Sequence, residues 1–334
     1  MASKMTPRER VLAALDLKEV DRPPVVCFTQ SATVDVMEAV KVYWPDAHTD
    51  AHKMAELAMG VPKVLGLESV RMPYCLTVEA EALGCKVDLG KQDRTPMIKQ
   101  HTYDEDAEVP IPESPVGRMK VVIEAVKIAK AKMGKEYPIV VGTTGPFTIA
   151  GHLVGTEKLL LWMIVNQDAV KKFVDIAVKV EKMYIEALVE AGADVIVMSD
   201  PSSSTDMMSA DMFDQYSQPA IKEVFANVGS AKTVLHICGN TTALLDRMIE
   251  CGVNGLSIEE KVSPEDAVRL VGGRAALVGN VGVVSPLLQG TPEECYDAGK
   301  RCMAAGFNLI APGCGLAARV PKANIEALVK AVKE

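Results

Sequence analysis

Eight short apolar runs, separated by helical patterns, constrain the fold of this chain more than any other feature of its sequence. Each run is rich in Val, Ile and Leu, is too short for an ordinary helix and lies close to turn residues. We therefore interpret each run as a buried strand. The runs are Val25–Phe28, Leu67–Arg71, Ile139–Gly142, Ala193–Met198, Thr233–His236, Gly255–Ile258, Ala276–Gly279 and Phe307–Ala311.

Helical patterns lie between most of these strands. The spacing of apolar residues predicts helices over 7–17, 119–132, 158–191, 243–250, 264–271 and 292–305. Several of these helices end at a glycine just before the next strand, as in Ala304-Ala305-Gly306-Phe307. Glycine is the usual residue at a helix C-terminus, so this punctuation supports an alternation of strands and helices.

Near-continuous apolar strands that alternate with helices are typical of a parallel sheet covered on both faces. Eight strands in 334 residues predict an α/β fold, a closed (β/α)8 TIM barrel with an N-terminal helical segment. We expect one domain over residues 1–334, because no interdomain linker or internal repeat is present. An open doubly wound sheet is the alternative, but no Gly-x-Gly-x-x-Gly follows the first strand. The stretch 73–115 fits no single strand–helix unit, and we interpret it as a hairpin insertion after strand two.

Charge and composition exclude two classes of partner. The formal net charge is -8 and no block of Lys and Arg stands out, which argues against a nucleic-acid partner. No apolar run reaches the ~18 to 20 residues that span a bilayer, and the N-terminus lacks the apolar core of a signal peptide. We therefore expect a cytoplasmic protein with no membrane partner, whose eight cysteines are reduced.

One histidine and two cysteines follow the ends of predicted strands. The active site of an eight-stranded βα barrel lies at the C-terminal ends of its strands. His236 and Cys238 come at the end of strand five, and Cys314 follows strand eight. A His-x-Cys pair in extended backbone points both side chains the same way, and Zn²⁺ prefers such a mixture of imidazole and thiolate ligands. The alternative is that the spacing is accidental and the three residues have no metal.

A zinc ion with three protein ligands keeps one open coordination position, as catalytic zinc sites do. Thiolate ligands make the metal a weak Lewis acid for hydrolysis but suit it to binding another thiol. The bound thiol then loses its proton at neutral pH and becomes a nucleophile. The trio therefore predicts activation of a substrate thiol.

Strand six ends in Glu259 and Glu260. Alternation along the strand favours Glu259 as the side chain that points into the barrel, where its carboxylate is a displaceable fourth zinc ligand. The alternative is that both are solvated charges at the start of a helix. Asp200, after strand four, is predicted to face the same mouth as a hydrogen-bonding group beside the metal, although Asp-Pro-Ser also starts a turn.

Two further polar residues follow strands. Asn280, after strand seven, is predicted to line the site, with a simple turn as the alternative. Arg71 ends strand two, and an arginine at the mouth is suited to pair with an anionic substrate group. The alternative for Arg71 is a structural ion pair with Glu79 or Glu81.

With these residues the chain resembles the methylcobamide:coenzyme M methyltransferases, which belong to the uroporphyrinogen decarboxylase superfamily. The resemblance extends over essentially the whole chain. The most specific segments are 236–240 and 311–315, because members of the family bind zinc through a His-x-Cys pair and a distant Cys. The similar segments are 6–15, 27–30, 43–48, 71–81, His236-Ile237-Cys238-Gly239-Asn240 and Ala311-Pro312-Gly313-Cys314-Gly315.

The resemblance implies a TIM barrel, a separate corrinoid protein as the methyl donor, and coenzyme M as the acceptor in methylotrophic methanogenesis. Cobalamin-independent methionine synthase, a more distant relative, has a Glu at nearly the spacing of Glu259 from the His-x-Cys pair, which supports Glu259 over Glu260. The decarboxylase itself lacks the zinc trio. Three alternatives stay open: another thiol acceptor such as homocysteine, a decarboxylase-like enzyme acting on a tetrapyrrole, and a non-catalytic module that binds a corrinoid protein.

Overall fold

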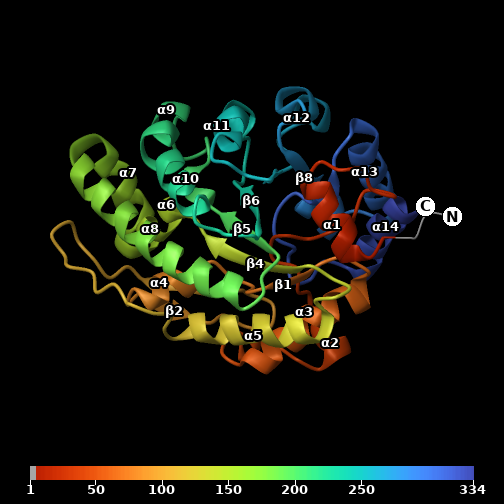
Figure 1. Cartoon of the computed structure of the whole chain (residues 1–334), viewed down its shortest axis with the longest axis horizontal. Coiled ribbons are helices and arrows are strands. Elements are labelled where there is room, and N and C mark those ends of the chain that lie inside the picture. Colours follow the sequence, from red (N-terminus) through yellow and green to blue (C-terminus); the bar gives the residue numbers. More distant parts are fainter. Residues whose placement is uncertain (1–4) are drawn as a thin grey trace.

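Seven parallel strands form one curled sheet at the centre of the molecule, and helices lie around it (Figure 1). The computed structural model describes residues 5–334. The order of strands in the sheet is β1-β4-β5-β6-β7-β8-β9. These strands are β1 (Val70–Met72), β4 (Ile139–Thr144), β5 (Val195–Ser199), β6 (Lys232–His236), β7 (Gly255–Ser257), β8 (Ala276–Val281) and β9 (Leu309–Pro312).

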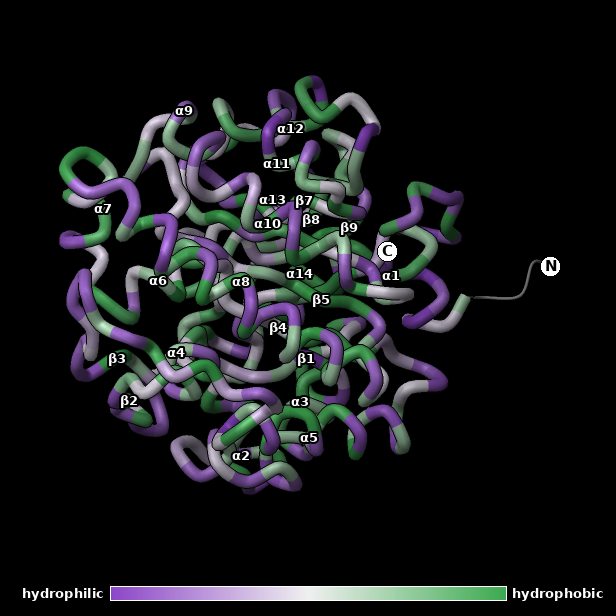
Figure 2. The backbone as a smooth tube through the Cα atoms, turned by 60° about the vertical axis from the view of Figure 1, so that its left-hand side comes forward, coloured by the Kyte–Doolittle hydropathy of each residue, from purple (hydrophilic) through white to green (hydrophobic). Residues whose placement is uncertain are grey.

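The strands carry apolar residues continuously because both of their faces are covered. Every residue of β4, β5, β7, β8 and β9 is buried, as expected for a parallel sheet with helices outside it. Figure 2 shows hydrophobic segments gathered along the central strands and hydrophilic ones mainly in the outer turns. The register pairs Ser199 with His236 and His236 with Ser257. The ends of three neighbouring strands therefore lie at one level, where polar side chains begin.

The first predicted strand, 25–28, is the exception, and the expectation of eight regular strands was wrong there. Val25 makes only an isolated parallel bridge with Ile310 of β9. The N–H of Val26 donates to the carbonyl of Ile310 at 2.9 Å, and the N–H of Glu68 donates to the carbonyl of Val25 at 2.7 Å. The N–H of Ile310 also donates to the carbonyl of Pro24 at 2.9 Å, but the two prolines before the segment have no N–H and cannot donate to the ladder.

The helices mostly follow the predicted alternation with the strands. α1 begins at a capping box of Thr6 and Glu9, and α13 at one of Thr291 and Glu294, a pairing that satisfies otherwise free backbone N–H groups. The outer helices are α1 (Pro7–Leu15), α2 (Val34–Val40), α3 (Ala51–Leu65), α5 (Arg118–Met133), α8 (Gln167–Glu190), α10 (Gln218–Phe225), α11 (Leu245–Ile249), α12 (Pro264–Val271), α13 (Pro292–Ala305) and α14 (Lys322–Lys333). Shorter helical segments are α9 (Ala210–Met212), η1 (Asp46–His48), η2 (Pro201–Ser203), η3 (Phe213–Ser217), η4 (Thr242–Leu244) and η5 (Val283–Leu288).

The long helix predicted over 158–191 is two helices in the structure. α7 (Thr156–Val165) ends before Asn166, and α8 starts at Gln167. Asn166 has φ -152°, and its side chain accepts from the N–H of Ala169 as an N-cap. This local capping signal ends the apolar periodicity that otherwise runs through the break. A further helix, α6 (Pro146–Val154), precedes α7 and was not predicted.

The stretch after β1 forms a small structure of its own. It contains α4 (Val78–Ala82) and the antiparallel pair β2 (Lys86–Asp88) and β3 (Met97–Gln100). Gly90 lies in the turn between them with φ +80°, and a Cβ there would come 2.0 Å from the carbonyl of Arg94. The turn is tied to the segment before α14 by an ion pair between Asp93 and Arg319 at 2.7 Å.

Within residues 5–334, no single helix is both long enough and apolar enough to cross a membrane. Helices α6 and α7 reach that length and composition only together, and they are bent by 102° at the break between them.

Candidate metal centre and substrate cavity

His236, Cys238 and Cys314 meet at the C-terminal ends of β6 and β9. The Nε2 atom of His236 lies 3.2 Å from Sγ of Cys238, and that sulfur lies 3.4 Å from Sγ of Cys314. All three donor atoms lie within 4.8 Å of one another, and no other His, Cys, Asp or Glu group in the described part of the chain is arranged to hold a metal ion. The structure thus brings together candidate ligands that are 76 residues apart in the chain.

Glycines beside the two cysteines allow the ligand-bearing loops to approach. Gly239 follows Cys238 with φ +85°, a backbone conformation that other residues rarely adopt. Gly313 precedes Cys314, and a Cβ there would lie 2.7 Å from Oε2 of Glu260 and 3.1 Å from Cα of Glu259. The loop after β9 can therefore lie directly against the loop after β7.

The imidazole of His236 is oriented by Ser257 on the neighbouring strand. Nδ1 of His236 lies 3.2 Å from the carbonyl oxygen of Ser257 and 3.1 Å from its hydroxyl. Because a carbonyl only accepts hydrogen bonds, the proton belongs on Nδ1, and the lone pair of Nε2 faces the two sulfur atoms. This is the usual arrangement of a metal-binding histidine. One imidazole nitrogen and two sulfurs in this geometry fit a zinc ion with one free position.

The two cysteine sulfurs form a hydrogen bond of 3.4 Å with each other. This hydrogen bond, together with the nearby His236, lowers the pKa of Cys314. The same hydrogen bond, together with burial, raises the pKa of Cys238. Negative charge therefore gathers on Cys314, and a cation that binds both sulfurs releases the remaining proton.

Glu259 lies beside the trio but outside its group of donor atoms. Its carboxylate accepts a hydrogen bond of 2.6 Å from the N–H of Gly239, the residue after Cys238. Glu260 extends toward Gly313 instead, and burial raises its pKa. Of the two carboxylates at the end of β7, Glu259 is the one bound to a backbone group next to a ligand.

Asp200 does not face the trio, and the expectation that it lines the site beside the metal is corrected here. Its carboxylate accepts from the N–H of Thr148 at 2.8 Å and from the Thr148 hydroxyl at 2.6 Å. Thr148 lies in the first turn of α6, a helix that the sequence reading missed. Asp200 is fully buried, and this burial raises its pKa. Its main-chain N–H, by contrast, donates to the carbonyl of His236 at 3.0 Å.

Asn280 also differs from the expectation of a side chain that lines the site. It is buried, and its amide donates to the carbonyls of Glu259 at 3.2 Å and Val262 at 2.7 Å. These bonds hold the loop after β7 in place. Asn280 thus binds the backbone of the loop that contains Glu259, and it does not line the cavity described below.

Arg71 lines that cavity from the end of β1 and is only 2% exposed. Its Nε donates to the carbonyl of Phe28 at 3.2 Å, and its Nη1 donates to the carbonyl of Pro73. Gly142 makes room for the guanidinium, since a Cβ there would come 2.1 Å from Nη2. Burial lowers the pKa of Arg71.

The ion pair considered for Arg71 is absent from the described residues. Glu79 instead accepts from the N–H and hydroxyl of Thr144 at 3.0 and 2.8 Å. Glu81 pairs with Arg118. The positive charge of Arg71 therefore has no carboxylate partner within the part of the chain that the structure describes, and it faces the cavity.

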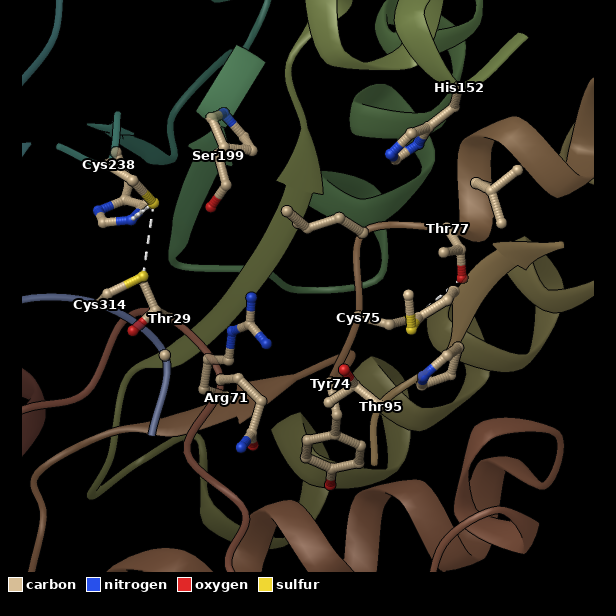
Figure 3. A pocket seen from close by; sticks show the side chains of 18 residues that line it. Thr29, Arg71, Tyr74, Cys75, Thr77, Thr95, His152, Ser199, Cys238 and Cys314 are labelled. Atoms are coloured by element: carbon tan, nitrogen blue, oxygen red, sulfur yellow. Dashed lines mark hydrogen bonds between the residues drawn. The ribbon is translucent and has the colours of Figure 1, made fainter. Parts of the chain in front are cut away.

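A cavity of about 440 Å³ extends from the trio to the segments between β1 and α6 (Figure 3). A space of this size holds a small-molecule substrate. Sequence reasoning missed Cys75, Thr77 and His152 in its wall because neither α4 nor α6 was predicted. Burial lowers the pKa of His152 to about 4, so its imidazole is neutral near pH 7. The lining residues are Thr29, Gln30, Arg71, Tyr74, Cys75, Leu76, Thr77, Thr95, Pro96, Met97, Ile98, His152, Ser199, Pro201, His236, Cys238, Cys314 and Gly315.

Relatives of the chain share this architecture over its whole length. The family profile described as "Uroporphyrinogen decarboxylase (URO-D)" matches residues 6–334. The methylcobamide:CoM methyltransferase MtaA of Methanosarcina barkeri is 40% identical over 336 residues, which cover 99% of both chains. The methylcobamide:CoM methyltransferase MtbA of Methanosarcina acetivorans is 38% identical over 99% of this chain and 98% of its own length.

Solved structures agree with the sequence relatives. A methyltransferase from Methanosarcina mazei has a TM-score of 0.95 and 41% identity, with 98% of each chain covered. A B12-independent methionine synthase from Shewanella sp. W3-18-1 has a TM-score of 0.64 at 14% identity, which shows a shared fold alone. The chain therefore belongs to the uroporphyrinogen decarboxylase family and, within it, is a methyltransferase of the methylcobamide:CoM methyltransferase group.

Proposed function

We propose that this methyltransferase moves a methyl group from a methylated corrinoid, carried by a corrinoid protein, to the thiol of coenzyme M in methylotrophic methanogenesis. The names of its relatives give methylcobamide and CoM as their reactants. The observation that carries the proposal is the trio of His236, Cys238 and Cys314, whose donor atoms lie within 4.8 Å of one another at the end of the cavity where the strands terminate.

Zinc on this donor set supplies a Lewis acid that binds a substrate thiol and lowers its pKa. His236, oriented by Ser257, and the two cysteines would hold the ion at the wall of the cavity. The thiolate sulfur then attacks the methyl carbon of methyl-cob(III)amide in line. A carbon–sulfur bond forms, the cobalt–carbon bond breaks, and both bonding electrons stay on cobalt as cob(I)amide. The thiol proton leaves to solvent before this step.

Glu259 is proposed as the displaceable fourth ligand. Its carboxylate is half-buried and accepts a hydrogen bond from the N–H of Gly239, one residue from Cys238. Glu259 would hold the fourth position of the ion until a substrate thiol takes that position. Asn280 keeps the Glu259 loop in position through its two backbone contacts. Asp200 acts at a distance, by joining α6 to the strand end beside His236.

Arg71 is proposed to bind the anionic end of coenzyme M. Its guanidinium is buried, lines the cavity and has no carboxylate partner among the described residues. A sulfonate is an anion that accepts such donors, so it would satisfy both the charge and the free N–H groups. The sulfonate end of the substrate is thus directed to Arg71, and its thiol to the metal.

We further propose that the curled sheet is a closed barrel of eight positions, with 25–27 as the eighth. Hydrogen bonds from this segment to Ile310 on one side and from Glu68 on the other support closure. A closed barrel explains why ligands from β6 and β9 converge over one central cavity.

The proposal is tested with zinc-loaded protein, methylcobalamin and either coenzyme M or homocysteine, with the loss of Co–methyl absorbance as the signal. We expect turnover with coenzyme M, and turnover reduced at least a thousandfold in Cys238→Ala and Cys314→Ala. Cys251→Ala is the matched control, since Cys251 is buried away from the cavity. Turnover with homocysteine alone would redirect the proposal to another acceptor, and full activity without zinc would overturn it.

A further inference from the structure

A third cysteine lines the substrate cavity. Cys75 lies between β1 and α4 and lines the cavity together with Tyr74 and Thr77. Figure 3 draws its side chain across the cavity from Cys238 and Cys314. No step of the methyl transfer proposed above uses this thiol.

Two hydrogen-bond donors point at the Cys75 sulfur. Nη1 of Arg118 donates to Sγ at 3.4 Å, and the hydroxyl of Thr77 donates to it at 3.3 Å. Nη2 of Arg118 also donates to the Thr77 oxygen at 2.8 Å. Because a guanidinium only donates, the Thr77 oxygen is the acceptor there, and its own hydrogen is free to point at the sulfur. Such donors bind more strongly when the sulfur carries negative charge.

The cavity also contains a buried cation that lacks a carboxylate partner. Arg71 is 2% exposed, lines the same cavity and interacts electrostatically with Cys75. Among the described residues its guanidinium is hydrogen-bonded only to main-chain carbonyls, so a small anion in the cavity would meet a charged donor. Cys75 therefore shares its cavity with a group that attracts small anions.

The other cysteines differ from Cys75, which is 9% exposed and lines the cavity, in position or in role. Cys238 and Cys314 belong to the zinc trio. The remaining five do not line the cavity, and burial raises the pKa of each. The raised values are about 11 for Cys27, about 12 for Cys251 and about 11 for Cys295, and the pKa values of Cys85 and Cys302 are also raised.

We propose that Cys75 is a thiol–disulfide exchange site for small anionic disulfides. The Cys75 sulfur, as thiolate, attacks one sulfur of RS–SR. The S–S bond of the reagent breaks, Cys75–S–S–R forms, and the RS⁻ that leaves takes up the proton that Cys75 lost. The disulfide itself is the oxidant. The adduct fills the cavity and blocks methyl transfer until a reducing thiol removes it.

The proposal rests on the proposed function only for the choice of R, the anionic thiol that the cavity accepts. Zinc-loaded protein is incubated with the symmetrical disulfide of coenzyme M, and the products are followed by intact mass and peptide mapping. We expect one RS unit per chain, bonded to Cys75, with zinc content unchanged. Methyl transfer falls in proportion to the adduct and returns after treatment with dithiothreitol.

Variants and a second reagent separate the contributions of Cys75, Thr77 and reagent charge to adduct formation. Cys75→Ser should form no adduct, whereas Cys251→Ser should react like the wild type. Thr77→Val keeps the side-chain shape, removes one donor to the sulfur and should slow adduct formation about tenfold. Bis(2-hydroxyethyl) disulfide, which is uncharged, should react about tenfold more slowly than the anionic reagent because it gains nothing from Arg71.

Three outcomes would overturn the proposal. These are an adduct on Cys238 or Cys314, no adduct on folded protein although the urea-unfolded chain reacts, and equal rates for the charged and uncharged reagents. Adduct formation on Cys75 in a protein that transfers no methyl group would leave this inference standing and count against the proposed function.

Discussion

Replacing Gly142 by alanine should displace the guanidinium of Arg71. Gly142 lies within β4, and an added Cβ would come 2.1 Å from Nη2 and 2.8 Å from Cζ of Arg71. Contacts this short do not occur between unbonded atoms. Because the guanidinium is buried against backbone, it cannot move aside without losing its hydrogen bonds.

The expected loss of unfolding free energy follows from the hydrogen bonds that Arg71 donates. Arg71 donates to the carbonyls of Phe28 and Pro73, and a hydrogen bond from a charged group contributes ~1.5–3 kcal/mol. Losing both therefore costs ~3–6 kcal/mol. We take the lower figure, ~3 kcal/mol, because the side chain relaxes, and for a chain of 334 residues this corresponds to a fall in Tm of ~4 °C.

Urea denaturation followed by circular dichroism measures this loss, and a double-mutant cycle identifies its source. In an Arg71→Ala background, Gly142→Ala should cost less than ~1 kcal/mol, because the clashing group is gone. The KM for coenzyme M should rise in Gly142→Ala, since the charge is displaced from the cavity. An equal loss of stability in both backgrounds would refute the reasoning.

Three further predictions concern pH and buried hydrogen bonds. Burial lowers the pKa of His48 to about 3 and that of His152 to about 4, whereas an unfolded histidine binds its proton near pH ~6.5. The unfolded state therefore holds more protons in acid, and the free energy of unfolding should fall between pH ~6.5 and ~4 by ~1.4 kcal/mol per pH unit for each histidine. His48→Phe should reduce this slope in urea titrations, and an unchanged slope would contradict the assignment. Asn166→Ala removes the N-cap of α8 and should cost ~1 kcal/mol of unfolding free energy, with Asn166→Asp as the control that retains it. Asn280→Ala leaves two backbone carbonyls without their donor and should cost ~2–3 kcal/mol; the zinc content measured by atomic absorption should stay unchanged, because His236, Cys238 and Cys314 lie on other segments.

The sequence predicts the helices and strands whose ends are marked by residues nearby in the chain. Helices α12 and α13 begin and end as predicted, because each has a proline at its first position and a glycine after its last. The strand after α13, and the position of Cys314 after that strand, are predicted by the same proline and glycine signals. The trio was also predictable, since strand ends of a parallel sheet share one edge, whatever their separation in the chain.

Features that depend on neighbours in three dimensions could not be predicted from the sequence. The apolar pattern continues through Asn166, and only its cap contact shows the break. Asp200 follows a strand as predicted, but its carboxylate turns to Thr148 of an unpredicted helix. Asn280 likewise turns to backbone groups behind the site. Alternation along a strand predicts on which face of the sheet a side chain lies. It does not predict which group that side chain contacts.

The residues of the cavity wall opposite the trio could not be predicted for a related reason. Cys75 and His152 lie on segments between regular strands, where no periodicity indicates which residues meet. The sequence marks Gly142 only as a glycine inside an apolar run. The guanidinium of Arg71, which fills the space of its missing side chain, becomes visible in the structure alone.

The central claim is that the trio holds a zinc ion whose fourth position accepts the substrate thiol. X-ray absorption at the zinc edge, on zinc-loaded protein with and without coenzyme M, tests it most directly. We predict two sulfur ligands at ~2.3 Å and one histidine nitrogen without substrate, and three sulfur ligands once coenzyme M is bound. An unchanged count of two sulfurs in the presence of saturating coenzyme M would contradict the account.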